Sequence, residues 1–134
     1  MLKTTATPPL PGAATAGPFV QTLTLADGPT VIGIARWHTS ASVSEGVVQL
    51  LDLYVQPPHQ RKGHGGRLFK EVVAQATAYF KLHRGRLRRV WVAVEHKQHI
   101  NARAFLTSQG FHHISTMKEL YRDQEQLLYT RAFD

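Results

Sequence analysis

The sequence predicts an α/β fold in which helices pack on the faces of a mixed β-sheet. Residues 47–55 form a nearly continuous apolar run, which is typical of a strand covered on both faces. Residues 64 to about 83 repeat apolar side chains at helical spacing. Shorter segments of strand character, separated by turn residues, lie on both sides of this pair. Strands and helices therefore alternate along the chain.

The N-terminal part is expected to contribute an arm and two strands. Residues 1–18 are rich in proline, alanine, threonine and glycine, which indicates an arm or a lead-in strand. FVQTLTL and TVIGIARWH flank a turn at residues 26–29, which predicts a β-hairpin. We expect residues 19–134 to form a single domain with one core.

The C-terminal part is expected to add a strand, a helix and a closing hairpin. Residues 90–95 predict a strand and residues 99–109 a shorter helix, which Gly110 is placed to end. Residues 111–117 and 126–133 predict the two strands of the hairpin. The expected order is β-β-β-α-β-α-β-β.

Composition limits the classes of protein. The net charge of +7 favours anionic partners such as phosphate-bearing ligands, nucleic acid or acidic proteins. The absence of cysteine excludes disulfides, thiolate catalysis and cysteine zinc sites, and it suits a cytoplasmic protein. No apolar run is long enough for a membrane-spanning helix, and the N-terminus lacks the apolar core of a secretion signal. The eight histidines show no metal-ligand spacing, so we expect no metal.

A glycine-rich basic turn joins the apolar strand to the long helix. Backbone N–H groups at a helix N-terminus bind phosphate, and glycines let the backbone approach it closely. The residues expected to supply these groups, with added side-chain donors and positive charge, are Gln60, Arg61, Lys62, Gly63, His64, Gly65 and Gly66. The turn lacks the Lys-Ser or Lys-Thr of a P-loop and the full glycine pattern of a dinucleotide fold. We interpret it as a diphosphate-binding turn of another kind.

The segment Gln60–Gly65 has the form Q/R-x-x-G-x-G/A and closely resembles the acyl-CoA loop of the GNAT superfamily, the acyl-CoA-dependent N-acetyltransferases. The apolar strand ending at Val55, followed by Pro57, also belongs to that pattern. The resemblance covers about residues 19–134. It implies a GNAT-like sheet that lacks the family's first strand and the two helices after it. It also implies acetyl-CoA as co-substrate, with pantetheine and the thioester carbonyl bound along Leu53, Tyr54 and Val55.

A second family segment, Asn-x-x-Ala-x-x-Phe-Tyr-x-x-x-Gly-Phe, matches in its apolar and glycine positions. The matching residues are Ala102, Phe105, Gly110 and Phe111. His99 stands at the Asn position, where it or Asn101 is expected to hold the pantetheine arm. Leu106 stands at the position of the Tyr that often protonates the CoA thiolate, and leucine cannot do so.

The carboxylate that often serves as the family's catalytic base is also missing from its usual position. The Glu that many relatives carry on the fourth strand falls on Gln49, which cannot accept a proton. We rank Asp52 first and Glu95 second as carboxylate candidates, although Asp52 could equally serve only a structural hydrogen bond. Tyr129, or Tyr121, is the candidate acid.

The resemblance predicts an N-acetyltransferase that moves an acetyl group to a primary amine, on a small molecule or a protein, by direct transfer in a ternary complex. Gln49 and Leu106 motivate an alternative, a degenerate domain that binds acyl-CoA but senses or regulates. Residues 84–89 and the net charge motivate a nucleic-acid-binding domain, which ranks last because no base-reading motif is present. A homodimer would cover the truncated N-terminal side.

Overall fold

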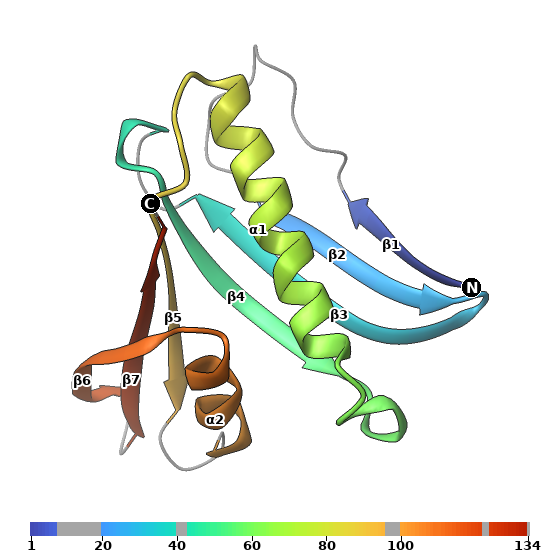
Figure 1. The fold of residues 1–134 in the computed structure, drawn as a ribbon. Coiled ribbons are helices and arrows are strands. Elements are labelled where there is room, and N and C mark those ends of the chain that lie inside the picture. Colours follow the sequence, from blue (N-terminus) through green and yellow to red (C-terminus); the bar gives the residue numbers. More distant parts are fainter. Residues whose placement is uncertain (8–19, 40–42, 96–99, 122–123, 134) are drawn as a thin grey trace.

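The computed structural model describes residues 1–7, 20–39, 43–95, 100–121 and 124–133. They form a seven-stranded mixed sheet with one long and one short helix (Figure 1). The strands are β1 (Leu2–Thr7), β2 (Val20–Asp27), β3 (Thr30–Thr39), β4 (Val47–Val55), β5 (Arg89–Glu95), β6 (His112–Tyr121) and β7 (Gln124–Ala132). The helices are α1 (His64–Leu82) and α2 (Ile100–Ser108), with short 3-10 turns η1 (Val43–Glu45) and η2 (Pro57–His59). The predicted mixed α/β fold is confirmed.

The sheet has the strand order β1-β2-β3-β4-β5-β7-β6. Strands β1 to β4 are antiparallel neighbours, whereas β4 and β5 run parallel and are connected through α1. A parallel pair needs a crossover, and α1 supplies it by lying across the sheet face formed by β2, β3 and β4 (Figure 1). The hairpin of β6 and β7 completes the far edge.

One face of α1 builds the core against the sheet. Its buried residues are Leu68, Phe69, Val72, Ala76, Tyr79 and Phe80, which follow the predicted helical spacing. Trp37 of β3 is fully buried beneath the helix, and its ring lies edge-on to that of Tyr79 with 6.3 Å between centroids. The sheet face that α1 does not cover is called the open face below.

Both helices end in a Schellman motif. In α2 the N–H of Phe111 donates to the carbonyl of Leu106 and that of Gly110 to Thr107, with Gly110 at φ 86°. The prediction that Gly110 ends this helix is confirmed. In α1 the N–H of Gly85 donates to Phe80 and that of Arg84 to Lys81. Here the left-handed position is taken by Arg84, at φ 62°, one residue before the glycine.

The expectation that the family's first strand is missing is wrong. Part of the segment predicted as an arm or a lead-in strand is β1, which pairs with β2 from Leu2 opposite Asp27 to Thr7 opposite Thr22. Its threonines favour a strand, and Leu2, Thr4 and Ala6 are half-buried while Lys3 and Thr5 are exposed. The prolines that follow obscured this alternation in the sequence. Residues 8–19, on which the two expected missing helices would fall, lie outside the described residues.

Neither α1 nor α2 is long and apolar enough to cross a membrane, and the described residues contain no other α-helix.

Candidate active site

Strands β4 and β5 separate after a short stretch of pairing. They are paired at Val47 with Arg89, Val48 with Val90 and Gln49 with Trp91. Beyond Gln49, β4 stays paired with β3 and β5 stays paired with β7, so the two strands diverge toward the end where α1 begins and α2 lies (Figure 1). We call this opening between β4 and β5 the wedge. A strand edge without a neighbour leaves backbone donors and acceptors free for a ligand.

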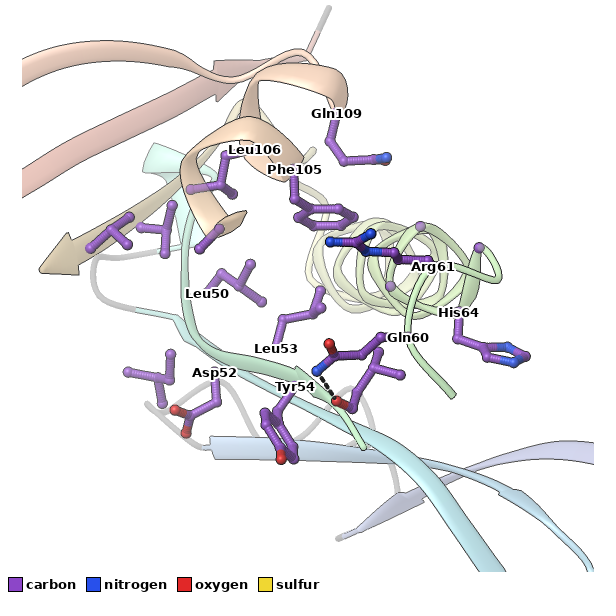
Figure 2. Close-up of a pocket in the computed structure, with 18 of the residues that line it drawn as sticks. Leu50, Asp52, Leu53, Tyr54, Gln60, Arg61, His64, Phe105, Leu106 and Gln109 are labelled. Carbon is purple, nitrogen blue, oxygen red and sulfur yellow. Dashed lines mark hydrogen bonds between the residues drawn. The ribbon is translucent and has the colours of Figure 1, made fainter. Parts of the chain in front are cut away.

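The wedge opens into a cavity of about 870 Å³, a size typical of small-molecule and cofactor sites. It is bounded by β4, the turn after it, the start of α1, the divergent part of β5, and α2 (Figure 2). The lining residues are Leu50, Leu51, Asp52, Leu53, Tyr54, Val55, His59, Gln60, Arg61, Gly63, His64, Gly65, Gly66, Val92, Ala93, Val94, Ala102, Phe105, Leu106, Gln109 and Gln126. The structure therefore brings the predicted turn residues and the predicted strand residues to one cavity. Lys62 lies in the same turn but is not among the lining residues.

The turn presents a helix N-terminus to the cavity. Arg61 and Gly63 both have left-handed backbone, at φ 61° and 84°, and α1 begins directly afterwards at His64. The N–H of Arg67 donates to the Gly63 carbonyl at 3.1 Å. The N–H groups of the preceding helical residues, His64 to Gly66, have no carbonyl within the helix to bind. They are the groups an anion could use.

Gln60, which lines the cavity, also anchors the turn. Its side-chain Nε2 donates to the backbone carbonyl of Val55 at 2.9 Å, which ties the turn to the end of β4 (Figure 2). The Val55 carbonyl thus points away from β3. The neighbouring Tyr54 carbonyl faces β3, because a Cβ added to Gly33 would come within 2.8 Å of it. Backbone direction alternates along a strand, so the N–H and carbonyl of Leu53 face the wedge, as those of Val55 do.

Gly65 of α1 lies close to the Phe105 ring of α2 in the cavity. A Cβ added there would lie 3.2 Å from Cε1 of Phe105 and 3.6 Å from Cδ2 of Leu53. A Cβ added to Gly66 would meet only Nε2 of Gln109, at 3.5 Å. Any side chain at position 65 would therefore project into the passage between the helices and β4.

The cavity reaches both faces of the sheet. Leu50 and Leu53 point from β4 toward Phe105, whereas Asp52 and Tyr54 point to the other side of the strand (Figure 2). Asp52 lies opposite Arg36 of β3, and its Oδ2 accepts from Arg36 Nε at 2.9 Å and contacts Nη2 at 2.6 Å. Both side chains are about half exposed. The ion pair therefore forms on the open face at the rim of the cavity.

A second polar pair lies beside the first. His38 of β3 is opposite Gln49 of β4, and its Nε2 is 2.7 Å from the Gln49 side-chain Oε1. Sequence reasoning singled out Gln49 as a lost carboxylate but missed His38. Strand alternation around the buried Trp37 could have found it, because His38 and Arg36 must share the face opposite Trp37.

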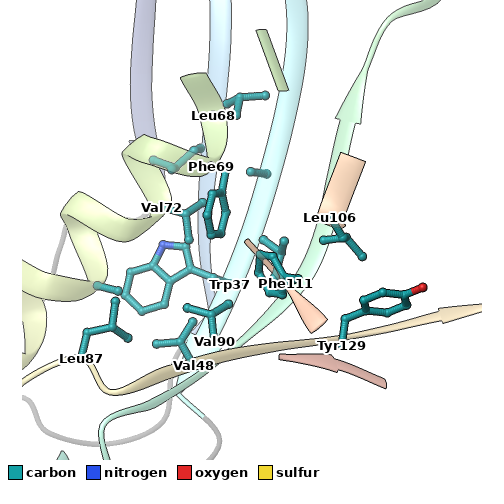
Figure 3. Packing of buried hydrophobic residues seen from close by; sticks show 14 of the residues in the cluster. Trp37, Val48, Leu68, Phe69, Val72, Leu87, Val90, Leu106, Phe111 and Tyr129 are labelled. Atoms are coloured by element: carbon teal, nitrogen blue, oxygen red, sulfur yellow. The ribbon is translucent and has the colours of Figure 1, made fainter. Parts of the chain in front are cut away.

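Tyr129 of β7 is not among the residues that line the cavity. Its side chain is buried in the core cluster that also contains Leu106 (Figure 3). Its hydroxyl accepts a hydrogen bond from Arg103 Nε of α2 at 3.2 Å. Leu106, at the family's Tyr position, does line the cavity.

The other candidates lie at or beyond the limits of the described side chains. Glu95 is the last residue of β5 and Asn101 lies in the first turn of α2, but their side chains are outside the described part, as is that of Tyr121. His99 lies outside the described residues altogether. Within residues that the structure does describe, no three histidine and carboxylate side chains cluster as they would to hold a metal ion.

Comparison with known proteins agrees with this geometry. The model of the acetyltransferase (GNAT) family matches residues 8–111. A search among curated protein sequences gave no match.

Solved acetyltransferase structures share the fold. A putative GNAT-family acetyltransferase from Desulfovibrio desulfuricans is 23% identical over 84% of this chain and 69% of its own, with a TM-score of 0.72. The PaiA N-acetyltransferase of Thermoplasma acidophilum, solved in complex with coenzyme A, is 18% identical over 85% of this chain and 61% of its own, with a TM-score of 0.68. A GNAT-family acetyltransferase from Elizabethkingia anophelis with acetyl-CoA bound is 15% identical over 85% of this chain and 76% of its own, with a TM-score of 0.68. The chain belongs to the GNAT acetyltransferase family.

Proposed function

We propose that this protein transfers the acetyl group of acetyl-CoA to a primary amine by direct transfer in a ternary complex. The observation that carries the proposal is the cavity, which runs from the N-terminus of α1 through the wedge to the open face. A cofactor could enter on the helix side and an acceptor on the other side. The two substrates would then meet at β4 without a covalent enzyme intermediate.

The turn and the start of α1 would hold the phosphates. The N–H groups of His64, Gly65 and Gly66 supply donors at a positive helix end. Arg61 lines the cavity and Lys62 adjoins it, and both add positive charge. The narrow passage at Gly65, which a Cβ would obstruct, fits a thin chain such as pantetheine. His99 and Asn101, at the start of the α2 region, are the proposed contacts for that arm.

The acyl end would lie along β4. Acetyl-CoA supplies an activated thioester whose carbonyl gains negative charge as an amine attacks. The N–H of Leu53 or Val55, which faces the wedge, would donate to such an oxygen. Tyr54 lies between them in the strand, and its side chain contributes to the open-face wall of the cavity. The apolar side chains of Leu50, Phe105 and Leu106 limit water around the site, which strengthens these hydrogen bonds.

The amine would approach from the open face. Asp52 is the carboxylate there and would attract the ammonium form of the acceptor. Its pairing with Arg36 favours a binding role over proton abstraction, since the Oδ2 atom is already engaged. Glu95 is the alternative carboxylate. Tyr129 is the proposed acid, although its hydroxyl is bonded to Arg103.

The test is acetyl transfer to a panel of primary amines, with free thiol and acetylated product measured together. The panel should contain small monoamines, polyamines, amino acids, aminoglycosides, and peptides with a free N-terminus or lysine. The proposal predicts equal amounts of thiol and acetylated amine with at least one acceptor. Thiol release without an acetylated product would contradict it.

An acyl-CoA-binding sensor is the second candidate. Leu106 lies in the cavity where many relatives have a tyrosine, and Gln49 replaces their glutamate. Tight binding of acetyl-CoA with no transfer to any panel amine would favour this function. In either case we propose a cytoplasmic location, in keeping with the absence of cysteine. A homodimer stays a prediction.

A further inference from the structure

His38 and Gln49 form a pair whose chemistry fits a proton acceptor. The Gln49 Oε1, an acceptor only, lies 2.7 Å from His38 Nε2. With the amide in this orientation, Nε2 carries the ring proton and Nδ1 of the neutral ring keeps its lone pair. Gln49 therefore holds the imidazole in the tautomer that leaves Nδ1 basic.

The pair is next to the point where the sheet opens. Gln49 and Trp91 form the last β4–β5 pair before the wedge, and His38 is the β3 partner of Gln49. His38 lies on the open face, because Trp37 beside it is buried under α1. His38 is half-buried and lies two residues from Arg36, about 7 Å along β3. Because Arg36 is paired with Asp52 on β4, this is also about the spacing between His38 and Asp52 along the strand direction. His38 and Gln49 are not among the residues that line the cavity, so an amine bound at Asp52 would reach His38 through one bridging water.

The other groups on this face are less suited to the role. Gln49 cannot accept a proton, and Arg36 and Asp52 engage each other. Arg89 of β5 donates through Nη1 to Thr130 Oγ1, and β2 places Val20 opposite His38. Tyr54 lies farther along β4, opposite Ile34. Among the described residues named here, His38 thus carries the one ring nitrogen that could take the proton.

We propose that His38 is the general base of the acetyl transfer, with Gln49 as its positioning residue. The inference rests on the proposed function. One proton of the bound ammonium goes to Nδ1 of His38 and from there to solvent, which frees the nitrogen lone pair. The amine nitrogen then bonds to the acetyl carbon, the C–S bond breaks, and the electron pair leaves with sulfur. The second proton that nitrogen loses goes through solvent to the thiolate. No oxidant or further reactant is needed.

The experiment compares the pH profile of kcat in the wild type and three variants between about pH 5 and pH 9, the range around the titration of imidazole. The acceptor is whichever panel amine the wild type acetylates fastest. In the wild type, kcat should fall toward low pH as the base is protonated, and we call this fall the acidic limb. His38→Asn should lower kcat about 100-fold, remove the acidic limb and leave the acetyl-CoA Kd unchanged. Gln49→Glu should shift that limb to higher pH by about one unit, because a carboxylate beside the ring favours its protonated form. The control is His112→Asn, an exposed residue of β6 outside the cavity lining, which should keep the wild-type profile.

The outcomes separate the two proposals. A wild type that acetylates no panel amine, although it binds acetyl-CoA, overturns the proposed function and the base with it. An active wild type whose His38→Asn variant keeps the acidic limb overturns only the assignment of His38. A loss of acetyl-CoA affinity in that variant equal to its loss of kcat would show a structural role and also overturn it.

Discussion

Replacing Gly65 by valine should block the cavity without removing any polar group. The Cβ alone would lie 3.2 Å from Cε1 and 3.5 Å from Cζ of Phe105, which is closer than a comfortable contact. The two methyl groups of valine extend beyond it toward β4, where Leu53 Cδ2 lies 3.6 Å from the Cβ position. The passage that we assign to pantetheine would be filled. Local overpacking of this kind costs about 1–3 kcal/mol of stability, which the fold can tolerate.

The expected loss of affinity is at least about 100-fold, which corresponds to roughly 2.7 kcal/mol. Ligand present at about 100 times its Kd stabilises the wild type by roughly 2.7 kcal/mol. At the same concentration, a variant with a 100-fold weaker Kd would gain only about 0.4 kcal/mol. Thermal unfolding with and without acetyl-CoA distinguishes these values, and circular dichroism establishes that the variant is folded.

Two neighbouring glycines provide matched controls. Gly66→Ala adds a Cβ whose nearest neighbour is Gln109 Nε2 at an ordinary 3.5 Å, so affinity should be nearly unchanged. Gly63→Ala adds a Cβ in open space but at φ 84°, so it should lose about 1–2 kcal/mol of stability without filling the passage. A folded Gly65→Val protein with wild-type affinity for acetyl-CoA would refute the assignment of this passage.

Three further substitutions test other parts of the structure. Asp52→Asn should raise the KM of the amine about tenfold and leave the acetyl-CoA Kd unchanged, because Asp52 lies on the acceptor side and would attract the ammonium group; an unchanged kcat/KM at every pH would make it structural. Arg84→Gly should raise the free energy of unfolding by about 1 kcal/mol in urea titration, since Arg84 is left-handed at φ 62°; a decrease would show a stabilising contact of its side chain. Gln60→Leu should lose about 1 kcal/mol, because it removes the 2.9 Å hydrogen bond to Val55. Unchanged stability of that variant would show that the turn holds without this bond.

The local parts of the site were predictable from sequence. The apolar run, the glycine-rich turn and the amphipathic helix follow one another in the chain, so their order fixes the strand, turn and helix N-terminus. Gly110 likewise predicted the end of α2, because glycine readily takes the left-handed backbone that ends a helix. The structure has Gly110 at φ 86°. The sequence left the first segment open between an arm and a lead-in strand because β1 is a short, threonine-rich edge strand followed by prolines.

The non-local parts could not be predicted in the same way. The wedge depends on where β4 stops pairing with β5, and strand pairing is decided by tertiary packing. The pairs of Arg36 with Asp52 and His38 with Gln49 depend on the β3–β4 register, which shifts between Arg36 and Trp37. Residue-by-residue pairing of β3 with β4 that ignored this irregularity would have placed the wrong residues opposite one another.

Thermal unfolding with saturating acetyl-CoA, with CoA and ATP as controls, tests the central claim most directly. Ligand at about 100 times its Kd should raise the midpoint by on the order of 10 °C for a domain of this size. The account predicts this rise with acetyl-CoA and CoA and little change with ATP. No rise with acetyl-CoA or CoA would contradict the assignment of the wedge and turn as an acyl-CoA site.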